Sequence, residues 1–417
     1  MDRKIDQQIN FEAFKKAYNR FDPRPLQGED IQRFYVDDLA KSFVNNITTT
    51  IRITDRYQKI LVIGHRGCGK TTLLNEVADM LKDKYYIISF AAENVLNIFD
   101  VETVDVLFAT YMEVLKSEQT KQVTFSKEAS NAFKSVMEPS ANKLRLKELG
   151  VEIGLNLPFL SNISGKFAVE KETRAILRED LSKEIDLLQQ NLSLACAEIA
   201  RQTKKEVLII IDNIDKFNTE SAEKVFIRDS HLVTAPEVKM IYTFPLETFY
   251  LESINPVRDR YEDQFISPVP LDDIDRNRQG DHFVYLKEMV WKRIEKGLIE
   301  DNALEELINL SGGLLRDLVK YMRDACKEAI LRNSSSINLA ITERVKAKQV
   351  NDYYRLFDYQ TYGQTAISVR DTRKRPLENH LTYLLTNLFV LEYRLGNDLW
   401  YDAHPCLKEV LQRWNQQ

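Results

Sequence analysis

Residues 59–71 read KILVIGHRGCGKT, and most of what the sequence says about the fold follows from them. Lys59–Ile63 is a short apolar run that ends in glycine, which is typical of a buried strand. Gly64–Thr71 matches the pattern G-x-x-x-x-G-K-[ST] in full. Apolar residues then recur at helical spacing (Leu73, Leu74, Val77, Met80 and Leu81). The sequence therefore predicts a strand, a glycine-rich turn and a helix in direct succession.

This loop pattern is suited to the phosphates of a nucleoside triphosphate. Its glycines let successive N–H groups face inward, and the start of the following helix adds partial positive charge. We expect Lys70 to reach the β- and γ-phosphates and the Thr71 hydroxyl to bind Mg²⁺. The predicted nucleotide-binding residues are the loop and the residue after it: Gly64, His65, Arg66, Gly67, Cys68, Gly69, Lys70, Thr71 and Thr72.

Further apolar runs predict the other strands of the same sheet. They are Tyr85–Phe90, Val207–Ile211, Lys239–Thr243 and Gln264–Ile266. Strands that alternate with helices predict an α/β fold with a parallel sheet and helices on both faces. The segment between the second and third strands is too long for one crossover. Within it, Val151–Val169 alternates apolar with polar or small residues around a turn, which predicts an inserted β-hairpin.

Acidic residues follow the third predicted strand, in the order Asp212-Asn213-Ile214-Asp215. Because open α/β sheets place ligands at the carboxyl ends of their strands, we expect Asp212 to hold Mg²⁺ together with Thr71. Many ATPases place a glutamate directly after this aspartate to polarise the attacking water. Asn213 cannot accept a proton at neutral pH, so Asp215 is the predicted water-orienting residue. A helix N-cap role for Asp215 is nearly as well supported.

A transferred phosphoryl group needs positive charge beyond the loop lysine, and arginine is the usual source. Arg316 falls in the first turn of a predicted helix, Leu314–Ile330, just after a Ser-Gly-Gly turn. A cation there opposes the helix dipole, which favours contact with nucleotide as its reason. Compensation by the adjacent Asp317 is the alternative.

Other polar residues give weaker signals. Thr243 follows the fourth strand and is a candidate for γ-phosphate contact, although a plain capping role fits equally well. Action across a subunit boundary is open to four arginines, Arg174, Arg178, Arg258 and Arg260, but a solvated surface charge is the better-supported reading of each. The predicted catalytic set is therefore Lys70, Asp212, Asp215, Thr243 and Arg316.

The composition excludes several classes of protein. Hydrophobic residues make up 44% of the 417 residues and charged residues 29%, so collagen-like and mostly disordered chains are excluded. With a net charge of −5, the protein as a whole has no electrostatic attraction to nucleic acid. The four cysteines form no CxxC pair, which disfavours a disulfide framework. No apolar run reaches membrane-spanning length, so we expect a cytoplasmic protein with no membrane partner.

The end of the chain carries a different pattern. A helix introduced by Pro376 precedes Val390–Arg394, a Gly396-Asn397-Asp398 turn and Leu399–Tyr401, which together indicate a hairpin after helices. Such an arrangement describes a winged helix-turn-helix. The expected domains are a lead-in (1–30), a nucleotide-binding core (31–270) with an insertion at about 100–205, a helical region (271–335) and the winged helix (336–417).

Taken together, the motifs resemble AAA+-type ATPases of the origin-recognition and STAND (NACHT-like) branches. The segments GHRGCGKT, IIIDNID, IYTFP and SGGLLRD occur in the same order as in those proteins, over roughly Ile31–Leu331. The ending FVLEYRLGNDLWYDAHP is similar to the winged-helix tail of bacterial members. The resemblance implies a P-loop NTPase sheet in the order 5-1-4-3-2, a helical lid, ATP as ligand, Thr243 as first sensor and Arg316 as lid arginine.

The resemblance also suggests functions. A switch ATPase with slow hydrolysis is expected, because Asn213 replaces the usual glutamate. Its partners would be further copies of the chain or a separately encoded effector protein, and bacterial relatives include anti-phage defence ATPases and transposition regulators. The alternative is a DNA-binding ATPase that uses the cluster Arg370, Arg373, Lys374 and Arg375. A scaffold with ATP as a structural ligand is a third reading.

Overall fold

The computed structural model describes residues 2–36, 40–120, 123–144, 153–266, 281–395 and 398–414. The chain divides into two compact units. The sheet unit comprises Asn46–Ile63 and Val77–Phe265. The loop unit comprises Met1–Asn45, Gly64–Glu76 and Ile266–Gln417.

A five-stranded parallel sheet forms the core of the sheet unit. Its strands are β1 (Lys59–Gly64), β2 (Tyr85–Ala91), β3 (Glu206–Asp212), β4 (Lys239–Pro245) and β5 (Asp263–Ile266). Their order is β2-β3-β4-β1-β5, which confirms the predicted order 5-1-4-3-2 read from the opposite edge. Every residue of β1 and β4 is buried, as expected for central parallel strands.

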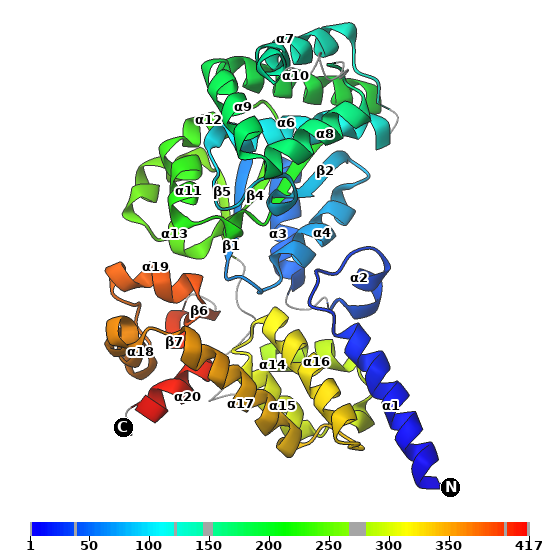
Figure 1. The fold of residues 1–417 in the computed structure, drawn as a ribbon, viewed down its shortest axis with the longest axis vertical. Coiled ribbons are helices and arrows are strands. Elements are labelled where there is room, and N and C mark those ends of the chain that lie inside the picture. Colours follow the sequence, from blue (N-terminus) through cyan, green and yellow to red (C-terminus); the bar gives the residue numbers. More distant parts are fainter. Residues whose placement is uncertain are drawn as a thin grey trace. The chain divides into compact units, whose positions relative to one another are not determined.

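Helices surround this sheet. They are α3 (Ala40–Ile53), α4 (Lys70–Leu81), α5 (Ala92–Val95), α6 (Thr103–Thr120), α7 (Lys127–Lys143), α8 (Leu157–Val169), α9 (Lys171–Lys183), α10 (Ile185–Thr203), α11 (Thr219–Glu223), α12 (Ser230–Thr234) and α13 (Leu246–Phe249). Figure 1 shows α6 to α10 gathered into one helical group beside β2, and both α6 and α10 contact that strand. The insertion predicted at about 100–205 is therefore a helical layer.

The β-hairpin predicted for Val151–Val169 is wrong. Residues 157–169 form α8, while 151 and 152 lie outside the described residues. The side chain of Asn156 caps the helix by accepting the Phe159 N–H at 2.9 Å, and a proline occupies the first turn. The buried residues Phe159, Leu160, Ile163 and Phe167 also lie on one helical face. These helical signals override the short stretch of alternation.

Ion pairs fasten α9 to the start of α6 and to the residues just before it. Arg178 donates to the Asp105 carboxylate at 2.5 Å and to Asp100 at 2.9 Å, and Arg174 donates to Asp100 at 3.1 Å. Arg174 and Asp105 are almost fully buried. Arg174 and Arg178 are therefore partners in ion pairs within the chain, and the reading of them as solvated surface charges is wrong.

The loop unit is mainly helical, as predicted for the region after the sheet. Its helices are α1 (Asp2–Arg20), α2 (Glu29–Phe34), α14 (Asp281–Trp291), α15 (Asp301–Leu310), α16 (Leu315–Leu331), α17 (Leu339–Leu356), α18 (Tyr359–Thr372), α19 (Glu378–Thr386) and α20 (Pro405–Trp414). The expected domain boundary near residue 270 lies outside the described residues. No helix in the described part of the chain is long and apolar enough to span a membrane.

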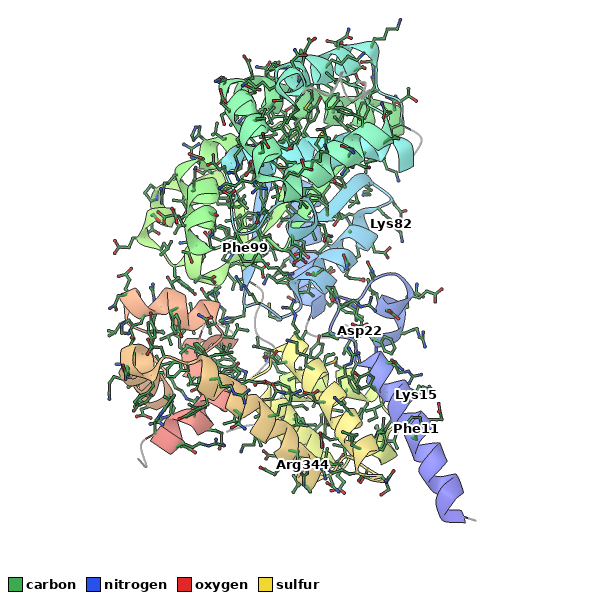
Figure 2. The ribbon with its side chains drawn as sticks, in the orientation of Figure 1. Phe11, Lys15, Asp22, Lys82, Phe99 and Arg344 are labelled. Atoms are coloured by element: carbon green, nitrogen blue, oxygen red, sulfur yellow. The ribbon has the colours of Figure 1, made fainter. Side chains whose placement is uncertain are left out.

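The expected lead-in (1–30) contains a packed helix, because α1 lies along α16. Phe14, Ala17 and Phe21 are buried, and the Arg323 guanidinium stacks 4.4 Å from the Tyr18 ring. Phe11 and Lys15 lie together on the outer side of α1 (Figure 2), with the ammonium 5.9 Å from the ring. The polar composition of residues 1–30 gave no apolar run that would mark this helix.

The predicted C-terminal hairpin is confirmed. Strands β6 (Val390–Leu395) and β7 (Asp398–Ala403) pair in antiparallel fashion, with Glu392 opposite Tyr401. The turn residues Gly396 and Asn397 lie outside the described residues. Helix α18 contacts β7, and α19 contacts β6. The helices and hairpin occur in the order expected of a winged helix, which stays a prediction.

Candidate nucleotide-binding site

The glycine-rich loop leads from the end of β1 at Gly64 to the start of α4 at Lys70. Gly67 and Gly69 have φ values of +86° and +102°, a region that residues with side chains rarely adopt. A Cβ atom at Gly69 would lie 2.9 Å from Leu315 Cδ1, and one at Gly67 would lie 3.0 Å from Arg316 Cβ. Both the backbone shape and the close packing therefore require glycine.

Lys70 lies inside the curl of this loop. Its ammonium donates hydrogen bonds to the carbonyls of Gly64 and His65, both at 2.9 Å, and the side chain is buried. Lys70 is also the first residue of α4, where helix N–H groups and the dipole favour an anion. A buried cation beside backbone donors at a helix start suits a polyphosphate, so the residues present fit the predicted ligand.

Arg316 lies against the loop, as its proposed role requires. Its backbone N–H donates to the Gly67 carbonyl at 3.0 Å. The first N–H groups of a helix have no partner within the helix, and the N-cap residue Leu314 supplies no side-chain acceptor here. The loop carbonyl takes that place, so α16 begins directly on the loop.

His65 makes a contact that the sequence did not suggest. Its Nε2 accepts the backbone N–H of Glu392 at 2.7 Å, and both residues are buried. Burial, reinforced by Lys70 and His404, lowers the pKa of His65 to about 3. The imidazole is therefore neutral and binds β6, whereas the sequence indicated only a loop residue near nucleotide.

The segment before α2 also contacts the start of α4. The Leu26 N–H donates to the Thr72 hydroxyl at 3.2 Å, and the Asn75 amide donates to the Leu26 carbonyl at 2.8 Å. Thr72, which the sequence predicts to bind nucleotide, is thus also a hydrogen-bond acceptor for the segment before α2.

Asp212 is the last residue of β3 and is buried. It is opposite Ala91, the last residue of β2, in the register of the two strands. Asn213 follows with a left-handed backbone, φ +63°, and opens a short 3₁₀ turn over Ile214–Lys216. The Thr243 hydroxyl accepts the Ile214 N–H at 3.1 Å, so β4 supports this turn.

Asp215 lies within that 3₁₀ turn and is buried. The capping position of the turn is Asn213, and the cap of the next helix, α11, is Asn218. The alternative reading of Asp215 as a helix N-cap is therefore wrong.

Sequence reasoning missed Glu93. This residue lies on α5 just beyond β2, and its carboxylate accepts from the Asn213 amide at 2.8 Å. It also pairs with Lys216 at 2.5 Å. The available signal was an acidic residue directly after a predicted strand, because neighbouring parallel strands end at the same edge of a sheet. A second carboxylate thus lies beside Asn213, the position at which many ATPases have a glutamate.

Burial of two histidines makes the loop unit sensitive to acid. Burial lowers the pKa of His404, like that of His65, to about 3, from an ordinary value of 6.5. Nδ1 of His404 accepts the Cys406 N–H at 3.2 Å, and Asp317 Oδ2 lies 3.8 Å from its Nε2. Both rings are therefore neutral in the folded state.

The unfolded chain binds more protons than the folded chain between pH 6.5 and 3, so stability falls as the pH falls through this window. We expect a loss of roughly 2 kcal/mol per histidine at pH 5. Thermal unfolding between pH 7.5 and 5 measures it. His404→Asn keeps an acceptor without the titration and should remove part of the drop, whereas His231→Asn, at an exposed position, should not. If the melting temperatures of wild type and His404→Asn fell equally between pH 7.5 and 5, His404 would not contribute to the loss of stability.

Comparison with known proteins adds to this geometry. Residues 40–245, just under half of the chain, match the family model described as the KAP family P-loop domain. No curated protein matches the sequence significantly. The Cdc6p structure from Pyrobaculum aerophilum is similar at a TM-score of 0.43 and 11% identity, over 95% of this chain and 97% of that one.

The RuvB Holliday junction branch migration motor of Thermotoga maritima is similar at a TM-score of 0.39 and 13% identity, over 93% of this chain and 98% of that one. At these scores neither structure carries an argument about this chain. The motif, the loop geometry, the sheet order and the family match agree with one another. The chain therefore contains a P-loop NTPase domain with an α/β fold.

Proposed function

We propose that this protein binds ATP with Mg²⁺, hydrolyses it slowly and acts as a switch. The observation that carries the proposal is the hydrogen bond from Arg316 N–H to the Gly67 carbonyl, which places the start of α16 on the phosphate loop. Bound Mg²⁺ would neutralise charge on the phosphates and polarise them toward attack. Lys70 and the loop N–H groups hold the phosphates, and Thr71 and Asp212 hold the metal.

Support for the metal pair comes from the sheet. Strands β1 and β3 belong to one parallel sheet, and the chain continues from the end of β1 into the loop that carries Thr71. Asp212 ends β3. Carboxyl ends of parallel strands share one edge, which is where such sheets bind their ligands.

Asp215 orients the attacking water in this proposal. Thr243 and Glu93 hold the turn that carries it, through the Ile214 N–H and the Asn213 side chain respectively. Asn213 supplies no proton acceptor, and the single remaining carboxylate in the turn is consistent with slow turnover. Glu93 is then a positioning residue that acts through Asn213.

The switch follows from the way α16 begins. A change in the Gly67 peptide on phosphate binding or release would alter the first turn of α16 and the Arg316 side chain beside it. Helix α16 packs on α1, α15 and α17, so this change would reach surfaces of the loop unit. We infer that ATP promotes association of several copies of the chain.

The solution mass in the presence of ATP, ADP or neither tests this proposal. We expect a larger mass with ATP alone, measured by light scattering, and no ATP-dependent increase for Arg316→Ala. Arg332→Ala is a suitable control, because Arg332 lies beyond the far end of the same helix and pairs with Glu328 near the surface. An unchanged mass for wild-type protein that has bound ATP would contradict the switch.

DNA binding receives less support from the structure. Arg370 of the basic cluster pairs with Asp371 at 2.7 Å, and this pairing offsets part of the positive charge. For the biological setting we infer anti-phage defence with a separately encoded effector, and the resemblance to bacterial STAND-like ATPases is its support.

A further inference from the structure

The C-terminal hairpin contacts both the phosphate loop and the turn Ser311–Gly313 before α16 (the lid turn), all within the loop unit. At the loop, His65 Nε2 accepts the Glu392 N–H at 2.7 Å. At the lid turn, the Tyr393 hydroxyl donates to the Gly312 carbonyl at 3.0 Å. Successive residues of β6 therefore bind the two segments that also bind each other through Gly67 and Arg316.

The β6 side of this contact is fixed from several directions. The Glu392 carboxylate accepts from the Tyr401 hydroxyl at 2.9 Å and from Arg394 at 3.1 Å. A Cβ atom at Gly312 would lie 2.8 Å from Leu391 Cδ1, so the lid turn packs tightly beneath the strand. The Glu392 N–H is thus held in place, and it needs an acceptor because it is buried.

The loop side of the contact is tied to phosphate binding. The same residue that accepts from Glu392 through its ring holds the Lys70 ammonium through its backbone carbonyl, at 2.9 Å. A shift of the His65 peptide would therefore change both the lysine position and the imidazole position. His65 thus joins the phosphate loop to Glu392, a residue 327 positions away in sequence.

We infer that His65 is a positioning residue that couples the phosphate loop to the β6–β7 hairpin. The docked hairpin holds the loop in its phosphate-cradling shape, and bound nucleotide in return holds the hairpin in place. Coupling of this kind is reciprocal by thermodynamic necessity. The inference rests on the proposed ATP binding and names the element through which nucleotide acts.

The neutral ring suits this task. Burial and the nearby Lys70 ammonium keep His65 unprotonated, so Nε2 is an acceptor at physiological pH. A protonated ring would present an N–H to the Glu392 N–H and break the contact. Lys70 and His404 are the charged or titratable groups that act on the ring.

Three variants separate acceptor chemistry from simple packing. His65→Leu fills space without an acceptor, and His65→Gln places an amide oxygen where it can accept from Glu392. Leu399→Ala, at an exposed position on β7, is the matched control on the hairpin. Circular dichroism and gel filtration establish that each variant is folded.

Two measurements are made on each full-length protein: calorimetric affinity for MgATP, and hydrogen exchange of the peptide that contains Glu392. We expect MgATP to slow exchange of that peptide at least about tenfold in wild type and in Leu399→Ala. His65→Leu should lose this protection, exchange faster without nucleotide, and bind MgATP about tenfold more weakly. His65→Gln should recover much of both properties.

Equal protection and equal affinity in wild type and His65→Leu would overturn the coupling while leaving ATP binding intact. Weaker binding in His65→Leu that His65→Gln does not relieve would assign a packing role to the ring and overturn the acceptor role. Absence of calorimetric heat in the wild-type protein would defeat the proposed function itself, and the coupling with it. The calorimetric measurement of MgATP affinity therefore distinguishes a failure of the coupling from a failure of the proposed ATP binding.

Discussion

Replacing Lys70 with alanine is expected to weaken MgATP binding by a factor of about 30 to several thousand. The substitution removes the buried ammonium that the loop carbonyls of Gly64 and His65 hold in place. Loss of one partner from a desolvated, hydrogen-bonded charge pair costs about 2–5 kcal/mol. Titration calorimetry with purified variant and wild type measures the change.

The chain offers a matched control for this variant. Lys82 lies at the surface after α4 and pairs with Asp79, with its side chain 60% exposed (Figure 2). Lys82→Ala should leave the affinity unchanged, since exposed ion pairs contribute little. Full affinity in a folded Lys70→Ala protein would show that the loop lysine does not contact phosphate.

Replacing Asp215 with asparagine should lower the rate of ATP hydrolysis about 100-fold while MgATP affinity stays within about threefold. A water-orienting carboxylate contributes about 10²- to 10⁴-fold, and the amide cannot accept a proton. Single-turnover assays with saturating enzyme separate the chemical step from binding. Glu93→Gln weakens the hold on Asn213 and removes the charge that pairs with Lys216, and it should slow turnover about tenfold.

The comparison of these two variants identifies the residue that orients the water. A larger decrease in the hydrolysis rate for Glu93→Gln than for Asp215→Asn would show that Glu93 orients the attacking water. Glu220→Gln is a suitable control because Glu220 lies in the first turn of the next helix, α11, outside the turn that carries Asp215. Unchanged turnover in both acidic-residue variants would show that neither carboxylate orients the water.

The sheet could be predicted because its determinants are local. Each central strand is a short apolar run with a clear end, and the order of strands followed from the family resemblance. The errors arose where local patterns conflict. The alternation over residues 151–157 is typical of a strand, yet the Asn156 cap and a buried helical face make residues 157–169 a helix. Helix α1 was not predicted, because its sequence is polar and its partner, α16, is distant in sequence.

In the candidate site, too, local motifs reveal some residues, whereas others are revealed only by tertiary contacts. Lys70, Asp212 and Arg316 lie within or beside recognisable motifs, so sequence reasoning could predict them as site residues. The Glu93–Asn213 contact joins residues 120 positions apart, and the His65–Glu392 contact joins residues 327 positions apart. Neither contact follows from spacing or composition. Both depend on which strand ends and hairpins the tertiary fold brings together.

The most direct test of the account is a calorimetric titration of the folded, full-length protein with ATP in the presence of Mg²⁺. The loop geometry around Lys70 predicts saturable heat with about one nucleotide bound per chain, and a marked loss of affinity when Mg²⁺ is removed by chelation. A folded protein that gives no heat with any nucleoside triphosphate and Mg²⁺ would contradict the account.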